Sequence, residues 1–261
     1  MKKQRRKRSY SSDLNKAQWR VIKSLLPPIH GNQSVSLRQI VNAIFYLTVT
    51  GCQWRNLPHD YPAWSTVYYH FAKWSANGTL EKINTAVCEL DRLNRGREKT
   101  PSAALIDSQS VKTSKEASEV GFDGGKWIKG HKRHVVADTL GNLLNVVVTA
   151  ANISDIAGAK LLLPKIKETC TTIKLIWADG TYRGGLVDWV QETLNATLEI
   201  VKQEEGQKGF KVLPKRWVVE RTLAWLGNYR RLSKDYERLT QNSEGMIYLA
   251  SIKTMLNRFT A

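Results

Sequence analysis

The sequence is poor in cysteine, methionine and histidine. Its 261 residues include three Cys, three Met and five His. The cysteines, Cys52, Cys88 and Cys170, are odd in number and far apart, which argues against a disulfide framework and against a cysteine-ligated metal site. We therefore expect the protein to function in a reducing compartment, the cytoplasm.

Long apolar segments and acidic residues are also scarce. No apolar run approaches the length of a membrane-spanning helix, and the basic N-terminus is not followed by the apolar segment of a signal peptide, so we expect neither. Lys and Arg number 40 against 23 Asp and Glu, which gives a formal net charge of +17. That imbalance predicts a polyanionic partner, and nucleic acid is the commonest one. The apolar fraction of 42% excludes a disordered polycation.

The first hundred residues have a helical pattern. Residues 1–12 form a basic N-terminal arm, which is either a solvated tail or a segment that lies along phosphates. In residues 13–95, apolar side chains at helical spacing predict four helices, capped by Asp13, Ser36, Ser65 and Thr79. Helix-turn-helix DNA binding is the natural hypothesis for such a small all-α domain, and a bundle that only supports the next domain is the alternative.

A polar linker separates this part from residues 103–261, where strand patterns dominate. We predict strands at 103–111, 132–137, 143–149, 173–178 and 198–201, and helices at 155–167, 186–193, around Glu220 and at 243–259. Pro164 predicts a break in the first of these helices. The order of elements is that of a ribonuclease H-like fold, a mixed five-stranded sheet flanked by helices in the α+β or α/β class. Residues 202–214 are predicted to form a loop.

Three carboxylates occupy special places in this pattern. Asp107 and Asp179 each close a short apolar run of strand character, and Glu220 lies inside an amphipathic helical run. A carboxylate at the end of a buried strand is costly unless a cation or a set of donors offsets its charge. Two aspartates and a glutamate suit a pair of Mg²⁺ ions, which prefer carboxylate oxygen. Alternatively, Asp179 is a turn residue before Gly180, and Glu220 pairs with Arg216 one helical turn earlier.

Two metal ions about 4 Å apart are suited to breaking phosphodiester bonds, because one orients the attacking oxygen and the other stabilises the leaving oxygen. A ligand at the centre of the sheet can reach both ions. We assign that bridging role to Asp107 and expect Asp179 and Glu220 to complete one ion each. No nucleophilic side chain is required.

Basic residues gather near these carboxylates. Residues 126–133 place four cations around Trp127, which suits phosphate contacts with a base or sugar stacked on the ring. A basic hairpin edge protected from aggregation by lysines is the alternative. On the helix of Glu220, a face with Arg216 and Arg231 and small residues between them leaves room for a DNA backbone. The predicted DNA contacts are Lys126, Trp127, Lys129, Lys132, Arg133, Arg183, Arg216, Arg230, Arg231 and Lys234.

Several blocks of the sequence resemble the DDE (Asp-Asp-Glu) transposases of bacterial insertion sequences, and among them the family named after insertion sequence five. They are residues 105–109, 121–134, 178–182 and 218–237, with 53–58 and 62–68 in the helical part. The resemblance implies that Asp107, Asp179 and Glu220 are the catalytic triad and the metal ligands. It also implies a Tyr-Arg-Glu-Lys signature, in which Arg216 fits the arginine while Leu213 and Gly227 replace the tyrosine and the lysine.

The resemblance implies an Mg²⁺-dependent DNA transposase, with Mn²⁺ able to replace Mg²⁺. Such an enzyme binds terminal inverted repeats, nicks DNA and catalyses strand transfer into target DNA, as a homodimer or higher oligomer in a synaptic complex at the nucleoid. A non-catalytic DNA-binding repressor or domesticated remnant, and a nuclease without strand transfer, are the alternatives. Because a short loop replaces any inserted domain at 202–214, we expect no DNA hairpin intermediate.

Overall fold

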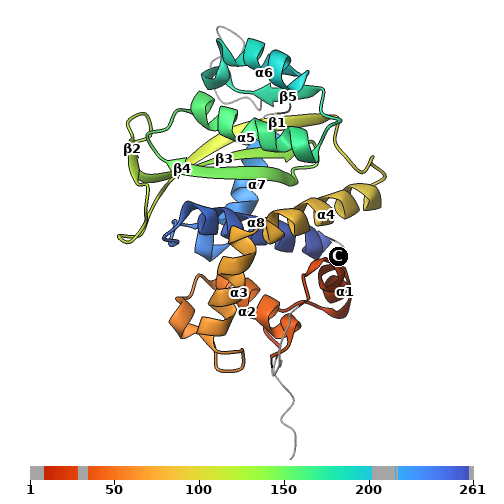
Figure 1. Ribbon diagram of the computed structural model, residues 1–261, viewed down its shortest axis with the longest axis vertical. Coiled ribbons are helices and arrows are strands. Elements are labelled where there is room, and N and C mark those ends of the chain that lie inside the picture. Colours follow the sequence, from red (N-terminus) through yellow and green to blue (C-terminus); the bar gives the residue numbers. More distant parts are fainter. Residues whose placement is uncertain (1–8, 29–34, 202–214, 216, 259–261) are drawn as a thin grey trace, which may run out of the picture.

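The structure is a computed structural model that describes residues 9–28, 35–201, 215 and 217–258. A mixed six-stranded sheet has helices on both faces, and the N-terminal helices lie beyond the helices of one face (Figure 1). The basic run at 2–8, Arg216 and the predicted loop at 202–214 with its three lysines are outside the described residues.

The predicted N-terminal helices are present, but three of the four predicted caps are wrong. The helices are α1 (Lys16–Leu25), α2 (Leu37–Thr50), α3 (Trp64–Ala76) and α4 (Thr79–Asn94), with a 3₁₀ turn, η1 (Trp54–Asn56), before α3. Asn15 rather than Asp13 caps α1, because Asn15 and Gln18 bond each other's backbone in a capping box. Ser36 is the N-cap of α2 as predicted. Gly51 ends α2 in the left-handed conformation, at φ +71°.

In the part of the chain that the structure describes, the sheet contains six strands, one more than predicted. They are β1 (Ala103–Lys112), β2 (Gly121–Asp123), β3 (Ile128–Asp138), β4 (Leu143–Ala150), β5 (Leu175–Ala178) and β6 (Thr197–Ile200). The order is β2-β3-β1-β5-β6, and β4 also pairs with β3. Strand β1 is antiparallel to β3 and parallel to β5, which is parallel to β6. Strand β2 escaped prediction because three residues are too few to show a period-two pattern.

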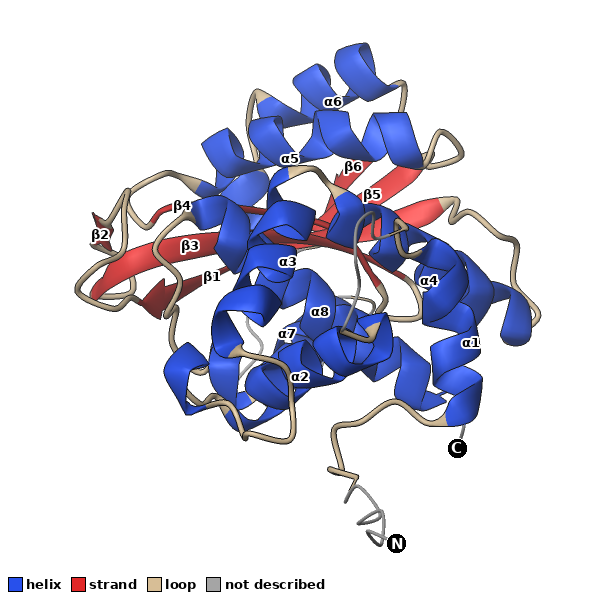
Figure 2. Cartoon of the chain, turned by 60° about the horizontal axis from the view of Figure 1, so that its bottom comes forward, coloured by secondary structure: helices blue, strands red, loops and turns tan. Residues whose placement is uncertain are grey.

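The two faces of the sheet are covered by different helices. Figure 2 shows α5 (Asp155–Thr169) and α6 (Leu186–Leu194) on one face and α7 (Trp217–Gly227) and α8 (Thr240–Arg258) on the other. Helix α5 approaches β3 so closely that a Cβ on Gly158 would lie 2.1 Å from Cε1 of His134. The predicted break at Pro164 is wrong, since α5 continues through it with Leu163 and Ile166 buried.

The C-terminal helix α8 packs among the N-terminal helices. It contacts α2, α3 and α4 as well as strand β4, and thirteen of its residues are buried. Met246, Ile252 and Leu256 belong to the same apolar core cluster as Phe45 of α2 and Val135 of β3. The two ends of the chain therefore share one core, and the division into domains at 13–95 and 103–261 stays a prediction.

Candidate active site

Asp107 and Asp179 meet at the point where β5 leaves the sheet. The last register pair of the parallel strands β1 and β5 is Leu105 with Trp177, and each aspartate follows two residues later. In-register neighbours on parallel strands place their side chains on the same face. Both aspartates are half-buried, and the charges of both act on the hydroxyl of Tyr182, so the fold places the two carboxylates near this one side chain.

The face on which Asp107 lies is the one covered by α7. Its neighbour Ser108 points to the other face, since its Oγ donates a hydrogen bond of 2.7 Å to Asp155 in α5. Side chains alternate along a strand, so Asp107 and Gln109 point the opposite way. Gln109 accepts a hydrogen bond from Arg133, which also bonds a carbonyl of the 3₁₀ turn η3 (Arg230–Leu232) on that side.

Helix α7 brings Glu220 to this same face. It contacts both β1 and β3, with Val218, Val219 and Leu226 buried, whereas Glu220 is exposed. The next turn of the helix is fixed to the β3–β4 connection, because Thr222 Oγ1 donates to the carbonyl of Gly141 at 3.0 Å. Glu220 therefore projects from an anchored helix that lies on the face of Asp107.

The three carboxylates do not form a closed metal cage. Within the described residues, no three His, Cys, Asp or Glu side chains come close enough together to hold a metal ion. Backbone donors hold the two aspartates, since Asp107 Oδ1 accepts from the N–H of Ser108 at 2.7 Å and Asp179 Oδ1 from that of Thr181 at 2.8 Å. The convergence of all three carboxylates on metal thus remains a prediction.

Tyr182 lies among the carboxylates and was missed by the sequence analysis. It ends the 3₁₀ turn η2 (Gly180–Tyr182) that follows Asp179, and its side chain is 1% exposed. Its hydroxyl forms no well-aligned hydrogen bond among the described residues. Burial first, and then the charges of Asp155, Asp107 and Asp179, raise the pKa of this hydroxyl. Tyr182 ends one of the blocks that resemble DDE transposases, but its position beside three acidic groups and Ser108 could not be read from the local sequence.

A second charged network lies on the opposite face of β1, and it was also missed. Lys132 Nζ is 3.4 Å from Asp155 Oδ1 and 3.3 Å from Asp123 Oδ2. Asp155 and Asp123 also accept hydrogen bonds from Ser108 and Ser110 of β1, at 2.7 and 2.5 Å. This network links α5 and the β2–β3 hairpin to the strand of Asp107, so it fixes the strand that carries the first carboxylate.

The predicted DNA-contacting residues divide into an exposed and a buried group. The exposed or half-exposed members are Lys126, Trp127, Lys129, Arg183, Arg230 and Lys234. Lys132, Arg133 and Arg231 are buried, at 6%, 3% and 6% exposure. Arg231 forms a buried ion pair of 2.6 Å with Glu237, and α7 ends at Gly227, so the helical face predicted to extend from Arg216 to Arg231 is wrong. The three buried cations serve protein partners and are removed from the proposed DNA-contact set.

Comparison with known families agrees with this arrangement. The sequence model of the family described as "Transposase DDE domain" matches residues 98–254, which include the sheet and all three carboxylates. The chain belongs to the DDE transposase family. A second family, described as "Putative transposase of IS4/5 family", matches residues 14–84 in the N-terminal helices. This second match supports an element of the IS4/5 type, as the resemblance of the sequence blocks predicted.

One relative of the transposase is a protein of Burkholderia cepacia, "Putative transposase for insertion sequence element IS402". The two are 31% identical over 121 residues, which is 42% of this chain and 54% of that protein. The transposase spans about half the length of this curated relative.

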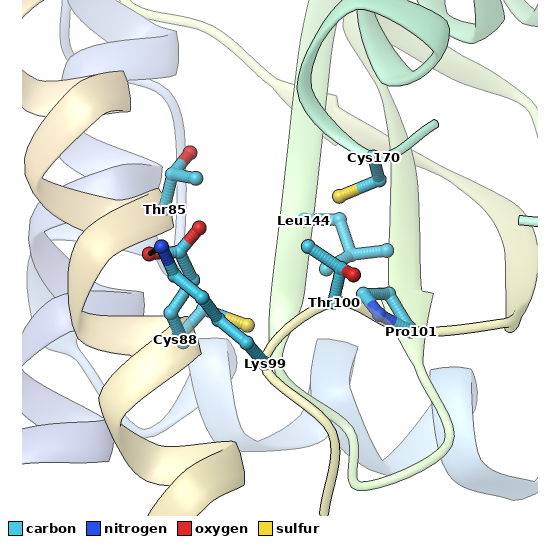
Figure 3. Close-up of a pocket in the computed structure, with 8 residues that line it drawn as sticks. Thr85, Cys88, Lys99, Thr100, Pro101, Leu144 and Cys170 are labelled. Carbon is cyan, nitrogen blue, oxygen red and sulfur yellow. Dashed lines mark ion pairs between the residues drawn. The ribbon is translucent and has the colours of Figure 1, made fainter. Parts of the chain in front are cut away.

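The transposase also has a narrow pocket that is separate from the carboxylates. Figure 3 shows it between α4 and the start of β1, with Cys88 and Cys170 on its walls and an ion pair of 3.2 Å between Lys99 and Glu89. Burial raises the pKa of both thiols, so they are protonated near neutral pH and are poor metal ligands or nucleophiles. This pocket offers no chemistry for phosphodiester cleavage.

No helix in the described part of the transposase is both long and apolar enough to cross a membrane.

Proposed function

We propose that this transposase binds the terminal inverted repeats of its element, nicks the DNA and transfers the freed 3′ end into target DNA. The observation that carries the proposal is the parallel register of β1 and β5, whose last pair is followed two residues later by Asp107 on β1 and by Asp179 just after β5, with Glu220 on a helix that contacts β1. The net charge of +17 supports DNA as the partner. Since such DNA is chromosomal, we place its action at the nucleoid.

Asp107, Asp179 and Glu220 would hold two Mg²⁺ ions, and Mn²⁺ would replace them. The donors fit, because all are carboxylate oxygens, the ligands that Mg²⁺ prefers. When bound, the ions would activate the attacking oxygen and stabilise the leaving 3′ oxygen. Asp107 lies on β1, which is placed between β3 and β5 in the sheet, and its carboxylate would be one of the groups that hold the metal.

Exposed cations around the carboxylates would hold the DNA backbone. We assign this role to Lys126, Lys129, Arg183, Arg230 and Lys234, with Arg216 keeping its predicted place among them. Phosphate contacts of this kind set the position of the duplex and carry no sequence information. Recognition of the repeat itself is assigned to the N-terminal helices, in which a helix-turn-helix arrangement is proposed, and a homodimer would bring the two repeat ends together.

The proposal is tested with the DNA that flanks the gene. The full-length protein is incubated with an end-labelled copy of the flanking inverted repeat, Mg²⁺ and a supercoiled target, and the products are separated on denaturing gels. Nicked repeats and repeats joined to the target are expected. Binding without cleavage would indicate a repressor or an inactive remnant, and cleavage without joining would indicate a nuclease.

A further inference from the structure

The hairpin that joins β2 to β3 holds an aromatic side chain out of the protein. Trp127 is 82% exposed, more than any other large apolar side chain among the residues described. Its ring meets that of Phe122, which is 50% exposed, edge-on at 6.1 Å between centroids. Figure 1 shows β2 at one end of the sheet, and Phe122 belongs to this strand. Apolar surface of this size at such a place commonly marks a binding site.

The backbone at Trp127 is held in a conformation that tryptophan disfavours. Its φ is +55°, in the left-handed region that glycine and asparagine adopt with little strain. The hairpin already contains Gly124 and Gly125. A glycine at position 127 would adopt the positive φ without strain. Strain of this kind persists only where the surrounding structure enforces it, and it is found most often at ligand-binding and active sites. The ring of Trp127 is exposed and contributes little to the core.

The base of the hairpin is rigid. Asp123 Oδ1 accepts hydrogen bonds of 3.1 Å from the N–H groups of Gly125 and Lys126, and Oδ2 accepts one from Ser110. Burial disfavours the charged form of Asp123, but the bonds from Ser110 and Lys126 and the charge of Lys132 outweigh it and lower its pKa to about 2. The carboxylate is therefore ionised at neutral pH, and the turn below Trp127 is fixed before any ligand arrives.

Cations flank the ring and connect it to the carboxylates. Lys126 and Lys129 are both exposed, one on each side of Trp127 in the sequence. Lys126 Nζ donates a hydrogen bond of 3.3 Å to the carbonyl of Ser108, the residue after Asp107. The exposed ring is thus tied to the strand that carries the first carboxylate. A flat aromatic ring between cations is the arrangement that binds single-stranded nucleic acid.

We propose that Trp127 is a stacking site for one unpaired nucleobase of the DNA that is held at the carboxylates. This inference rests on the proposed function. A base inside a duplex has both faces covered by its neighbours, so the ring stacks only on a base that has left the stack. Lys126 and Lys129 bind the phosphates on either side of that base. The site therefore selects DNA whose end is frayed near the bond to be cut.

A comparison of DNA duplexes with paired and unpaired ends distinguishes base stacking on Trp127 from general DNA binding. The full-length protein is titrated with two random-sequence duplexes, one fully paired and one with a single unpaired base at one end. Stacking of one base on an aromatic side chain corresponds to roughly a tenfold change in affinity. The wild type is expected to prefer the unpaired end by about this factor. Trp127→Gly, which relaxes the backbone, should keep the fold and lose the preference, whereas Trp127→Phe should retain part of it.

Leu161, which is 55% exposed on α5, supplies the control, since Leu161→Ala should leave the preference unchanged. A duplex with 5-iodouracil as the unpaired base should photocrosslink to the peptide that contains Trp127. Equal affinity of the wild type for the two duplexes, or an unchanged preference in Trp127→Gly, overturns the inference. The inference is also overturned if Trp127→Gly changes the oligomeric state but not the DNA preference. That result would show that Trp127 and Phe122 contact another protein chain. Failure of the wild type to bind either duplex would instead contradict the proposed function.

Discussion

Asp107 lies beside Asp179 because two parallel strands, β1 and β5, are paired in a register that places the two residues at the same level. Leu105 pairs with Trp177, and each aspartate is the second residue after its member of that pair. Strand β5 ends at Ala178, while β1 continues to Lys112. The part of β1 beyond Asp107 is therefore not paired with β5.

Neutral isosteres of the three carboxylates should separate catalysis from binding. We expect Asp107→Asn, Asp179→Asn or Glu220→Gln to abolish nicking of the flanking repeat, because an amide cannot replace a carboxylate as an Mg²⁺ ligand. Gel-shift affinity for the repeat should stay within a few-fold of the wild type. Loss of binding in a variant with unchanged circular dichroism would show that the carboxylate contacts DNA or orders the DNA-binding surface.

Tyr182→Phe should lower activity and change stability little. The buried hydroxyl interacts only weakly with the hydroxyl of Ser108 and forms no well-aligned hydrogen bond among the described residues, so its removal should change the free energy of unfolding by no more than about 1 kcal/mol. If the hydroxyl positions the groups around the metal ligands, nicking should fall by roughly tenfold or more, with a higher Mn²⁺ concentration needed for binding by electron paramagnetic resonance. A destabilised variant with wild-type nicking would assign Tyr182 to the core alone.

His131 makes stability fall as the pH rises. Its Nδ1 lies 2.9 Å from Asp235 Oδ2 and its Nε2 lies 2.6 Å from the carbonyl of Ser118. Burial alone would lower the pKa of His131, but these two acceptors outweigh it and raise the pKa. A raised pKa contributes stability that is complete below the unfolded value of about 6.5 and is lost as the pH rises through the folded value.

His131→Gln should cost about 3 kcal/mol at mildly acidic pH, because it leaves Asp235 buried without its cation. The difference from wild type in urea denaturation should shrink as the pH rises. His134 is the control, since burial lowers its pKa to about 4 and it is neutral throughout this range. The stability difference of His134→Gln should therefore not change with pH. A His131 variant with an equally flat profile would show that His131 is neutral in the folded protein.

Removal of the exposed cations should weaken DNA binding without sequence preference. We expect Lys126→Ala, Lys129→Ala and Arg183→Ala each to reduce the slope of log affinity against log salt by about one. Lys174→Ala supplies the matched control, since Lys174 is exposed but precedes the opposite end of β5 from Asp179. Equal effects of all four substitutions would indicate that DNA is attracted by the overall positive charge and not bound along a defined surface.

The N-terminal helices should depend on α8 for their stability. Residues 1–95 alone would lose the contacts of α2, α3 and α4 with α8 and expose their apolar side chains to water. We expect this fragment to lack a cooperative thermal transition and a peptide of residues 240–258 to restore one. A fragment that unfolds cooperatively and binds the flanking repeat by itself would establish 13–95 as an independent DNA-binding domain.

The ends of α1 and α2 show which helix boundaries can be predicted from local sequence. Ser36 and Gly51 bound α2 as predicted; the Ser36 side chain forms no capping hydrogen bond, whereas Gly51 ends the helix through its left-handed conformation, which depends on local sequence alone. Asp13 did not cap α1, since its carboxylate accepts hydrogen bonds from the N–H of Tyr10 and the hydroxyl of Tyr61 instead. Tyr61 is far from Asp13 in the sequence, so that competition could not be anticipated from local pattern.

The sequence by itself determined the apolar periodicities, and with them five of the six strands and the helices that flank them. It also determined the charge of the chain and the blocks that mark a DDE transposase, because these depend only on residue type and spacing. The tertiary structure decided which side chains meet. Lys132, Arg133 and Arg231 look like surface cations in the sequence, yet all three are buried, and each has a partner from a distant segment, which for Arg231 is the carbonyl of Cys52. Tyr182 and Trp127 look alike as aromatic residues, but folding buries one among carboxylates and exposes the other. Burial depends on strand pairing and helix packing between distant segments, which no local pattern records.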